Sequence, residues 1–79
     1  PEKGFFFYPN PTSGQIVLSN HRGVAGVAEV FTPTGQLLKS RPLAEGESFW
    51  ELGLPSGIYL LKVSFEDGEA ETDRLIINR

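Results

Sequence analysis

The sequence predicts an all-β protein, specifically an immunoglobulin-like β-sandwich of about seven mostly antiparallel strands. Three observations lead to this fold class. Nine glycines and six prolines in 79 residues interrupt the chain too often for long helices. Apolar residues recur in short runs rather than at helical spacing. Turn-forming residues separate these runs at intervals typical of sandwiches and barrels.

The first half of the chain contains four predicted strands. An aromatic run over residues 5–8 is followed by an aliphatic run over residues 15–19. Residues 24–31 and 36–41 flank the tetrapeptide at 32–35, which has proline second and glycine fourth and therefore suits a type I turn. We expect these last two strands to form a hairpin.

The second half contains three more predicted strands. Residues 47–52 form the first of them, and residues 57–65 and 69–78 flank Glu66-Asp67-Gly68. An Asp-Gly pair at the tip of two apolar runs is typical of a hairpin turn. Alternation predicts that the core-facing residues of the last two strands are Tyr59, Leu61, Val63, Phe65, Leu75 and Ile77. In the third strand, Ala28 and Val30 are expected to point inward.

Composition excludes several classes of protein. With no cysteine and one histidine, the chain has no disulfide, thiolate zinc site or multi-histidine metal site. A net charge of −3 without a basic block is poor for nucleic-acid binding, and no apolar run is long enough to span a bilayer. The chain starts at Pro1 without a visible signal peptide, so we expect a piece of a longer protein. Residues 1–4 are predicted to end a linker and residues 5–79 to form one domain.

No residue pattern indicates catalysis. The single histidine, His21, lies in a turn sequence, and no nucleophile or acid is predicted beside it. The carboxylates Glu69, Glu71 and Asp73 alternate along the last strand, which predicts one solvated face rather than a cation site. We therefore expect no enzyme activity, no metal ion and no cofactor.

Aromatic residues leave one binding function open. Phe49 and Trp50 are adjacent, so one of them must point away from the core of an alternating strand. A small carbohydrate-binding β-sandwich would expose Trp50 on a flat face or cleft, with Phe6 or Tyr8 beside it.

Four short motifs follow one another along the chain. They are Tyr8-Pro9-Asn10-Pro11-Thr12-Ser13-Gly14, the turn that ends in Gly35, Leu54-Pro55-Ser56-Gly57-Ile58-Tyr59, and the final Arg74-Leu75-Ile76-Ile77-Asn78-Arg79. Gly14, Gly35 and Gly57 suit turn positions with an unusual backbone conformation. Asn10 tolerates turn geometry, and a buried Tyr59 hydroxyl would need a partner.

In this order and spacing the motifs resemble the C-terminal sorting domain of the type IX secretion system (Por secretion system) of Bacteroidetes, type A, from about Phe6 to Arg79. The resemblance implies a non-catalytic address label fused to an N-terminal cargo, which the system moves from the periplasm across the outer membrane to the cell surface. The implied partners are the outer-membrane translocon and a sortase-like surface protease that cuts before Phe5. Nucleic acid and a membrane span are not expected.

The resemblance also implies candidate sorting and recognition residues. These are Tyr8, Pro9, Asn10, Pro11, Gly14, Gly35, Leu54, Pro55, Gly57, Tyr59, Arg74, Leu75, Ile76, Ile77, Asn78 and Arg79. The final strand is the first candidate for recognition, because a terminal strand can add to the edge of a partner sheet. Its apolar residues are equally well explained as core. A generic immunoglobulin-like spacer or adhesion module also remains an alternative.

Overall fold

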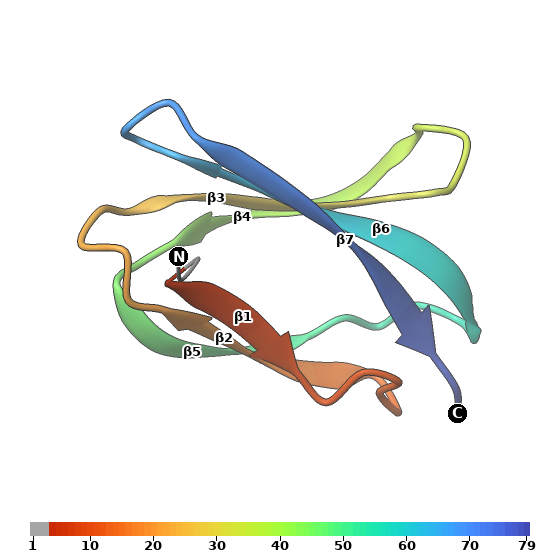
Figure 1. Cartoon of the computed structure of the whole chain (residues 1–79). Helices are drawn as coiled ribbons and strands as arrows, with labels where there is room; N and C mark the ends of the chain where they lie inside the picture. Colours follow the sequence, from red (N-terminus) through yellow and green to blue (C-terminus); the bar gives the residue numbers. More distant parts are fainter. Residues whose placement is uncertain (1–3) are drawn as a thin grey trace.

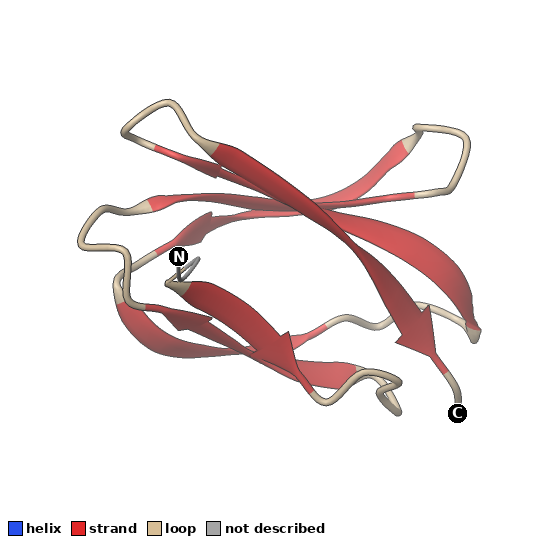
Figure 2. Cartoon of the chain, viewed as in Figure 1, coloured by secondary structure: helices blue, strands red, loops and turns tan. Residues whose placement is uncertain are grey.

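The computed structural model describes residues 4–79, which contain seven strands joined by loops and no helix (Figure 2). Each predicted strand is confirmed, with its ends within two residues of the expected positions. The strands are β1 (Phe5–Tyr8), β2 (Gln15–Asn20), β3 (Gly26–Phe31), β4 (Leu37–Leu43), β5 (Gly46–Glu51), β6 (Gly57–Phe65) and β7 (Ala70–Ile77). Among these residues no helix is long and apolar enough to cross a bilayer.

The strands form two facing sheets, which confirms the sandwich (Figure 1). One sheet has the order β1-β2-β5 and the other the order β4-β3-β6-β7, and all paired strands are antiparallel. The fourth strand lies on the four-stranded sheet. In a constant-type immunoglobulin domain it would instead join the first, second and fifth strands.

Both predicted hairpins are present. The turn between β3 and β4 closes through a hydrogen bond from Gly35 N to Thr32 O at 2.9 Å, and Gly35 has a φ of 102°. The turn between β6 and β7 closes from Gly68 N to Phe65 O at 3.0 Å. A positive φ is readily adopted only by glycine, which explains the residue type at Gly35.

The core lies between the sheets and uses the predicted faces. Alternate residues of each inner strand point inward because successive strand side chains face opposite ways. Leu18, Val30, Leu61 and Leu75 are at most 1% exposed. A fully buried aliphatic side chain of this size contributes roughly 1.5–3 kcal/mol, so these positions hold the two layers together.

One of Phe49 and Trp50 faces outward, as alternation predicts, and it is Phe49. Trp50 is only 8% exposed and packs in the core, whereas Phe49 points outward and is 60% exposed. The guanidinium of Arg41 lies 5.6 Å from the centre of the Trp50 ring. The carbohydrate-binding alternative requires an exposed tryptophan, so the structure contradicts it.

The acidic residues of β7 also differ from the expectation in one respect. Glu71 and Asp73 pair with Val63 and Leu61, which face the core, so both carboxylates lie on the inner side of β7. Asp73 nonetheless stays exposed, and Glu71 is half-buried. They lie at an open edge of the sandwich, where inner positions still reach solvent.

An ion-pair group holds the loops at the end of the sandwich where β1 begins. Arg22 Nη2 lies 2.9 Å from Asp67 Oδ2, and Arg22 Nη1 lies 3.7 Å from Glu71 Oε2. The same guanidinium lies 4.3 Å from the centre of the Phe65 ring. A hydrogen bond from the Glu69 backbone N–H, together with Arg22, lowers the pKa of Asp67 from its ordinary value of 3.8.

Replacing Gly26 by alanine should destabilise the fold. An added Cβ would lie 2.3 Å from Ser64 O of the neighbouring strand, so backbone would have to move. We expect Gly26→Ala to lower the free energy of unfolding by about 1–3 kcal/mol in chemical denaturation. Gly57→Ala is the matched control, because the nearest atoms to its Cβ would belong to the Tyr59 side chain at 3.5 Å, an ordinary contact distance. An unchanged midpoint for Gly26→Ala would contradict the close approach of β3 and β6.

The Asp67 contacts should give a pH-dependent contribution to stability. Because the folded-state pKa of Asp67 is lowered, its contribution is present above the unfolded-state pKa and is lost as pH falls through the folded-state value. We expect Asp67→Asn to be less stable than the parent at neutral pH and the difference to vanish in strong acid. Urea titrations across this range measure it, and a difference that persists at the acid end would refute it.

Candidate functional site

Three of the four motifs meet at one end of the sandwich. The loop after β1, the turn before β6 and the residues at the end of β7 contact one another there, on the side where the label C stands in Figure 1. Gly35 lies apart, in the β3–β4 turn. Apart from its two chain neighbours, no residue comes within 4 Å of the position that a Cβ would take there. The structure thus brings together every candidate motif except this turn.

Asn10 binds the outer edge of the C-terminal strand. Its Nδ2 donates to Arg74 O at 2.8 Å, and its Oδ1 accepts from Ile76 N at 2.9 Å. A side-chain amide offers one donor and one acceptor, like a peptide group. Asn10 therefore takes the place of a residue from a neighbouring strand.

Thr12 continues this pairing and is a residue that the sequence interpretation missed. Thr12 N donates to Ile76 O at 2.9 Å and Asn78 N donates to Thr12 O at 2.8 Å, which makes a parallel bridge to Ile77. Thr12 Oγ1 accepts from Gly14 N and Gln15 N, both at 3.1 Å, and also bonds Gln15 O. Its only sequence signal is its place directly after Tyr8-Pro9-Asn10-Pro11.

Arg79 ties the end of the chain to the turn before β6. Its backbone N donates to Ser56 Oγ at 3.0 Å, and its Nε donates to Leu54 O at 2.8 Å. The guanidinium lies over Gly14, where an added Cβ would come within 3.1 Å of Nη2. Gly14 also has a φ of 138°, so both space and conformation favour glycine there.

Tyr59 anchors the same turn from the core side. The ring is 8% exposed, and its hydroxyl donates to Pro55 O at 2.6 Å. This partner satisfies the hydroxyl, as expected for a buried tyrosine. Gly57 does not have the special conformation that we predicted. The positive φ in this turn belongs to Gly53, at 67°.

The residues on either side of Asn10 are exposed. Tyr8 is 42% exposed, and its ring stacks on Phe6 with centres 5.9 Å apart. Pro9 and Pro11 are also exposed, and each follows a cis peptide bond. These three residues flank the loop at the surface, whereas Asn10 turns toward β7.

The C-terminal strand divides its side chains between two environments. Leu75 and Ile77 are 0% and 2% exposed and belong to the core. Arg74 and Ile76 point outward, as predicted, and Asn78 and Arg79 are exposed. The outward backbone groups of Arg74 and Ile76 are already bonded by Asn10 and Thr12, so a partner strand cannot add there while these bonds hold.

An exposed apolar surface surrounds the outward side chain of Ile76. Ile58 pairs with Ile76, and the next row across the sheet runs through Leu60 and Phe31 to Leu37, with Arg74 at its other end. Ile58 and Leu37 are 51% and 49% exposed. We call Phe31, Leu37, Ile58, Leu60 and Ile76 the outer apolar patch.

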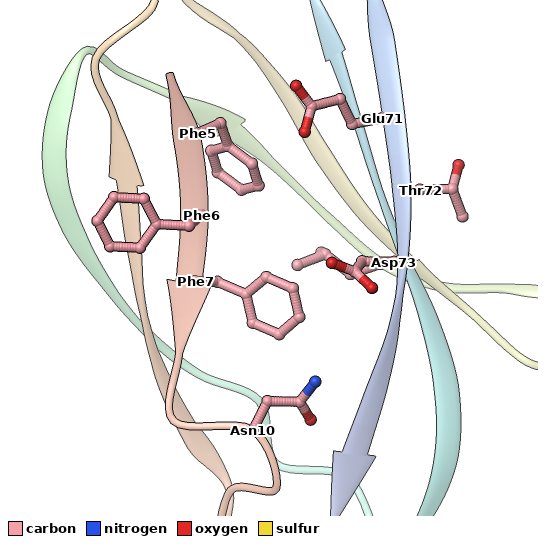
Figure 3. A pocket seen from close by; sticks show the side chains of 8 residues that line it. Phe5, Phe6, Phe7, Asn10, Glu71, Thr72 and Asp73 are labelled. Atoms are coloured by element: carbon pink, nitrogen blue, oxygen red, sulfur yellow. The ribbon is translucent and has the colours of Figure 1, made fainter. Parts of the chain in front are cut away.

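The described residues include no group suited to hold a metal ion. His21 is exposed, as predicted. One cavity of about 180 Å³ lies between β1 and β7 (Figure 3). It is lined by Phe5, Phe6, Phe7, Asn10, Leu61, Glu71, Thr72 and Asp73.

Removing the Asn10 amide should release the edge of β7. We expect Asn10→Ala to lower the free energy of unfolding by about 0.5–1.5 kcal/mol and to speed amide hydrogen exchange at Ile76, which loses its acceptor. Asn78→Ala is the matched control, because Asn78 contributes its backbone N–H to the contact. Unchanged exchange at Ile76 in Asn10→Ala would contradict the assignment of this bond.

Comparison with known proteins agrees with the resemblance. Residues 6–78 match the family described as "Secretion system C-terminal sorting domain". No curated protein sequence is significantly similar to the chain.

A solved structure shares the fold. It is PorZ, described as an essential bacterial surface component of the type-IX secretion system of Porphyromonas gingivalis. The match has a TM-score of 0.72 and 22% identity, and it covers 96% of this chain and 12% of that chain. The family match covers nearly all of the described residues. The chain therefore belongs to the Por secretion system C-terminal sorting domains, non-catalytic domains that direct the secretion of a cargo protein by the type IX system.

Proposed function

We propose that the type IX machinery recognises this sorting domain on the outer apolar patch and on the adjoining Arg74. One observation carries the proposal: the C-terminal strand presents Arg74 and Ile76 outward, beside Ile58, which is 51% exposed. A cluster of exposed aliphatic side chains next to a cation is typical of a protein-binding surface.

The recognised features are side chains rather than the strand edge. Backbone pairing along Arg74 and Ile76 would first require loss of the Asn10 and Thr12 bonds. Side chains on the outer face need no such change. The proposal thus keeps the C-terminal strand as the first candidate for recognition but replaces edge addition with contact on the face of the sheet.

Apart from Gly35, which lies in the separate β3–β4 turn, the other candidate residues serve mainly to hold this strand in place. Asn10 bonds its outer edge, Gly14 leaves room for the Arg79 guanidinium, and Tyr59 fixes the turn that accepts the Arg79 contact. Tyr8, Pro9 and Pro11 shape the loop that carries Asn10, and Leu54 and Pro55 supply the carbonyls that Arg79 and Tyr59 bond. Substitution at these positions would weaken recognition through the position of β7.

The specific partners follow from the same proposal. The outer-membrane translocon would bind the folded domain in the periplasm, and a sortase-like surface protease would then cut in the linker before Phe5. Type A membership and the division into a linker at 1–4 and a domain at 5–79 are part of this proposal. Residues 1–3 lie outside the described part of the chain. A cut before Phe5, away from the recognised strand, is supported by Figure 1, in which β1 begins at the opposite end of the sandwich from the end of β7.

A transport assay tests the recognition surface. The chain is fused to the C-terminus of a fluorescent reporter that carries a signal peptide, and it is expressed with and without a working type IX system. We expect the parent fusion to reach the cell surface or medium only with the system. The double variant Ile58→Ser/Ile76→Ser should remain in the periplasm, because it removes apolar contacts from the patch.

Phe49→Ser is the matched control, since Phe49 is 60% exposed on the outer face of the other sheet. It should be exported like the parent. Thermal unfolding of each isolated variant separates loss of folding from loss of recognition. Normal export of a folded double variant would refute the patch, whereas failure of the parent fusion in a competent host would refute transport by this machinery. Truncation after Asp73 is a poorer test, because it removes the buried Leu75 and Ile77.

A further inference from the structure

The sandwich has two open sides, and on one of them the strand edges are protected from pairing. On the β4–β5 side, Pro42 of β4 has no N–H to offer, and Arg41 Nη1 donates to Phe49 O of β5 at 2.8 Å. Proline and a bridging charged side chain both protect a strand edge from pairing. A further strand is therefore poorly accommodated there.

The other side, between β1 and β7, is only half closed. Asn10 and Thr12 occupy the edge of β7 at Arg74 and Ile76. Beyond Asn10 the cavity of about 180 Å³ separates the two strands, and Figure 3 shows Phe5, Phe7 and Asp73 pointing toward it. We call this cavity and the two facing strand edges the β1–β7 groove.

Backbone groups of β7 point into the groove. In an antiparallel ladder, alternate residues bond opposite sides. Glu69 O accepts from Phe65 N of β6, whereas Arg74 O and Ile76 N bond Asn10 on the other side. The bonds at both ends of β7 thus show one pattern: odd-numbered residues bond β6 and even-numbered residues face the other way. The N–H and C=O groups of Ala70 and Thr72 therefore point away from β6.

The edge of β1 has the same arrangement. Gly4 O accepts from His21 N, so even-numbered residues of β1 bond β2. The backbone groups of Phe5 and Phe7 therefore point outward, toward β7. Within residues 4–79 no backbone group pairs with these outward groups of Phe5, Phe7, Ala70 and Thr72.

The side chains of the groove combine an apolar floor with negative charge. Phe5, Phe7 and Leu61 line its inner part, and Glu71 and Asp73 lie on the β7 wall. Arg22 lies 3.7 Å from Glu71, but no cationic side chain of the described residues lies within ion-pair distance of Asp73. A long cationic side chain fits this combination, because its methylene stem packs on apolar surface while its charge meets a carboxylate.

We infer that the β1–β7 groove binds an extended basic segment of another protein, which adds as a strand to β7 at Ala70 and Thr72 and places a lysine or arginine toward Asp73. Backbone bonds to a free edge provide affinity, and alternate side chains provide specificity in this mode of binding. The negative wall selects a basic segment over an acidic one. This inference concerns the free half of the edge and does not depend on the outer apolar patch or on transport.

Peptide titration of the isotope-labelled chain tests the inference by nuclear magnetic resonance. The probe is a short capped peptide in which lysine alternates with threonine, and the control peptide has glutamate in place of lysine. We expect the lysine peptide to shift the amide signals of Phe5, Phe7, Ala70 and Thr72 and to leave those of β4 unchanged. The glutamate peptide should shift none of them.

Two substitutions identify the contacts. Thr72→Pro removes an N–H that points away from β6, so the β6–β7 ladder is kept while the added strand loses its donor, and binding should weaken by about tenfold or more. Thr72→Val is its matched control and should bind like the parent. Asp73→Asn keeps the local acceptor for Arg74 N but loses the charge, and should weaken binding by about twofold to fivefold.

Each result decides the matter. Selective binding of the lysine peptide that is lost in Thr72→Pro and weakened in Asp73→Asn supports the groove. Absence of binding, equal binding of both peptides, or shifts confined to the outer apolar patch would overturn it. If Thr72→Pro does not give a folded spectrum, retention of full affinity by the folded Asp73→Asn variant overturns it instead.

Discussion

The pairing of Asn10 and Thr12 with the C-terminal strand is the contact on which the candidate site depends. Asn10 and Thr12 follow β1 in one sheet, whereas Arg74 and Ile76 belong to β7 in the other sheet. The bonds thus close half of one side of the sandwich by linking its layers. They also hold β7 so that Leu75 and Ile77 fill the core. Without this link, the backbone of β7 would be hydrogen-bonded to β6 alone.

The same contact explains why one short strand can serve both structure and recognition. Strand residues alternate between the two faces, so fixing the edge of β7 commits Leu75 and Ile77 to the core and leaves Arg74 and Ile76 outside. Conversely, Tyr59 and Arg79 act on the outer face only indirectly, through the turn that they bond together. A motif that looks continuous in the sequence is therefore divided between stabilising and exposed positions.

Local features of the sequence were sufficient for the strands but not for the site. Alternation gave the faces of β6 and β7, and the turn residues gave both hairpins, because each depends on near neighbours. The Asn10 bonds join residues more than sixty positions apart, and no local pattern specifies such a contact. Adjacent Phe49 and Trp50 show a similar limit. Alternation requires one to face outward, but the register with β2 decides which one. In the turn before β6, glycine content alone could not distinguish Gly53 from Gly57.

The edge of β7 has one half that Asn10 and Thr12 cover and one half that is open, and the inner side chains of the strand differ between these halves. An edge strand with core-facing apolar residues along its whole length would pair readily with another such edge. Leu75 and Ile77 occupy the half that Asn10 and Thr12 cover, whereas Glu71 and Asp73 occupy the half that stays open. Charge therefore replaces apolar surface where the covering ends. Negative charge disfavours a second copy of this acidic chain, whose net charge is −3, and favours a segment of opposite charge. The residues that keep the open edge from self-association are thus the ones that would determine what it accepts.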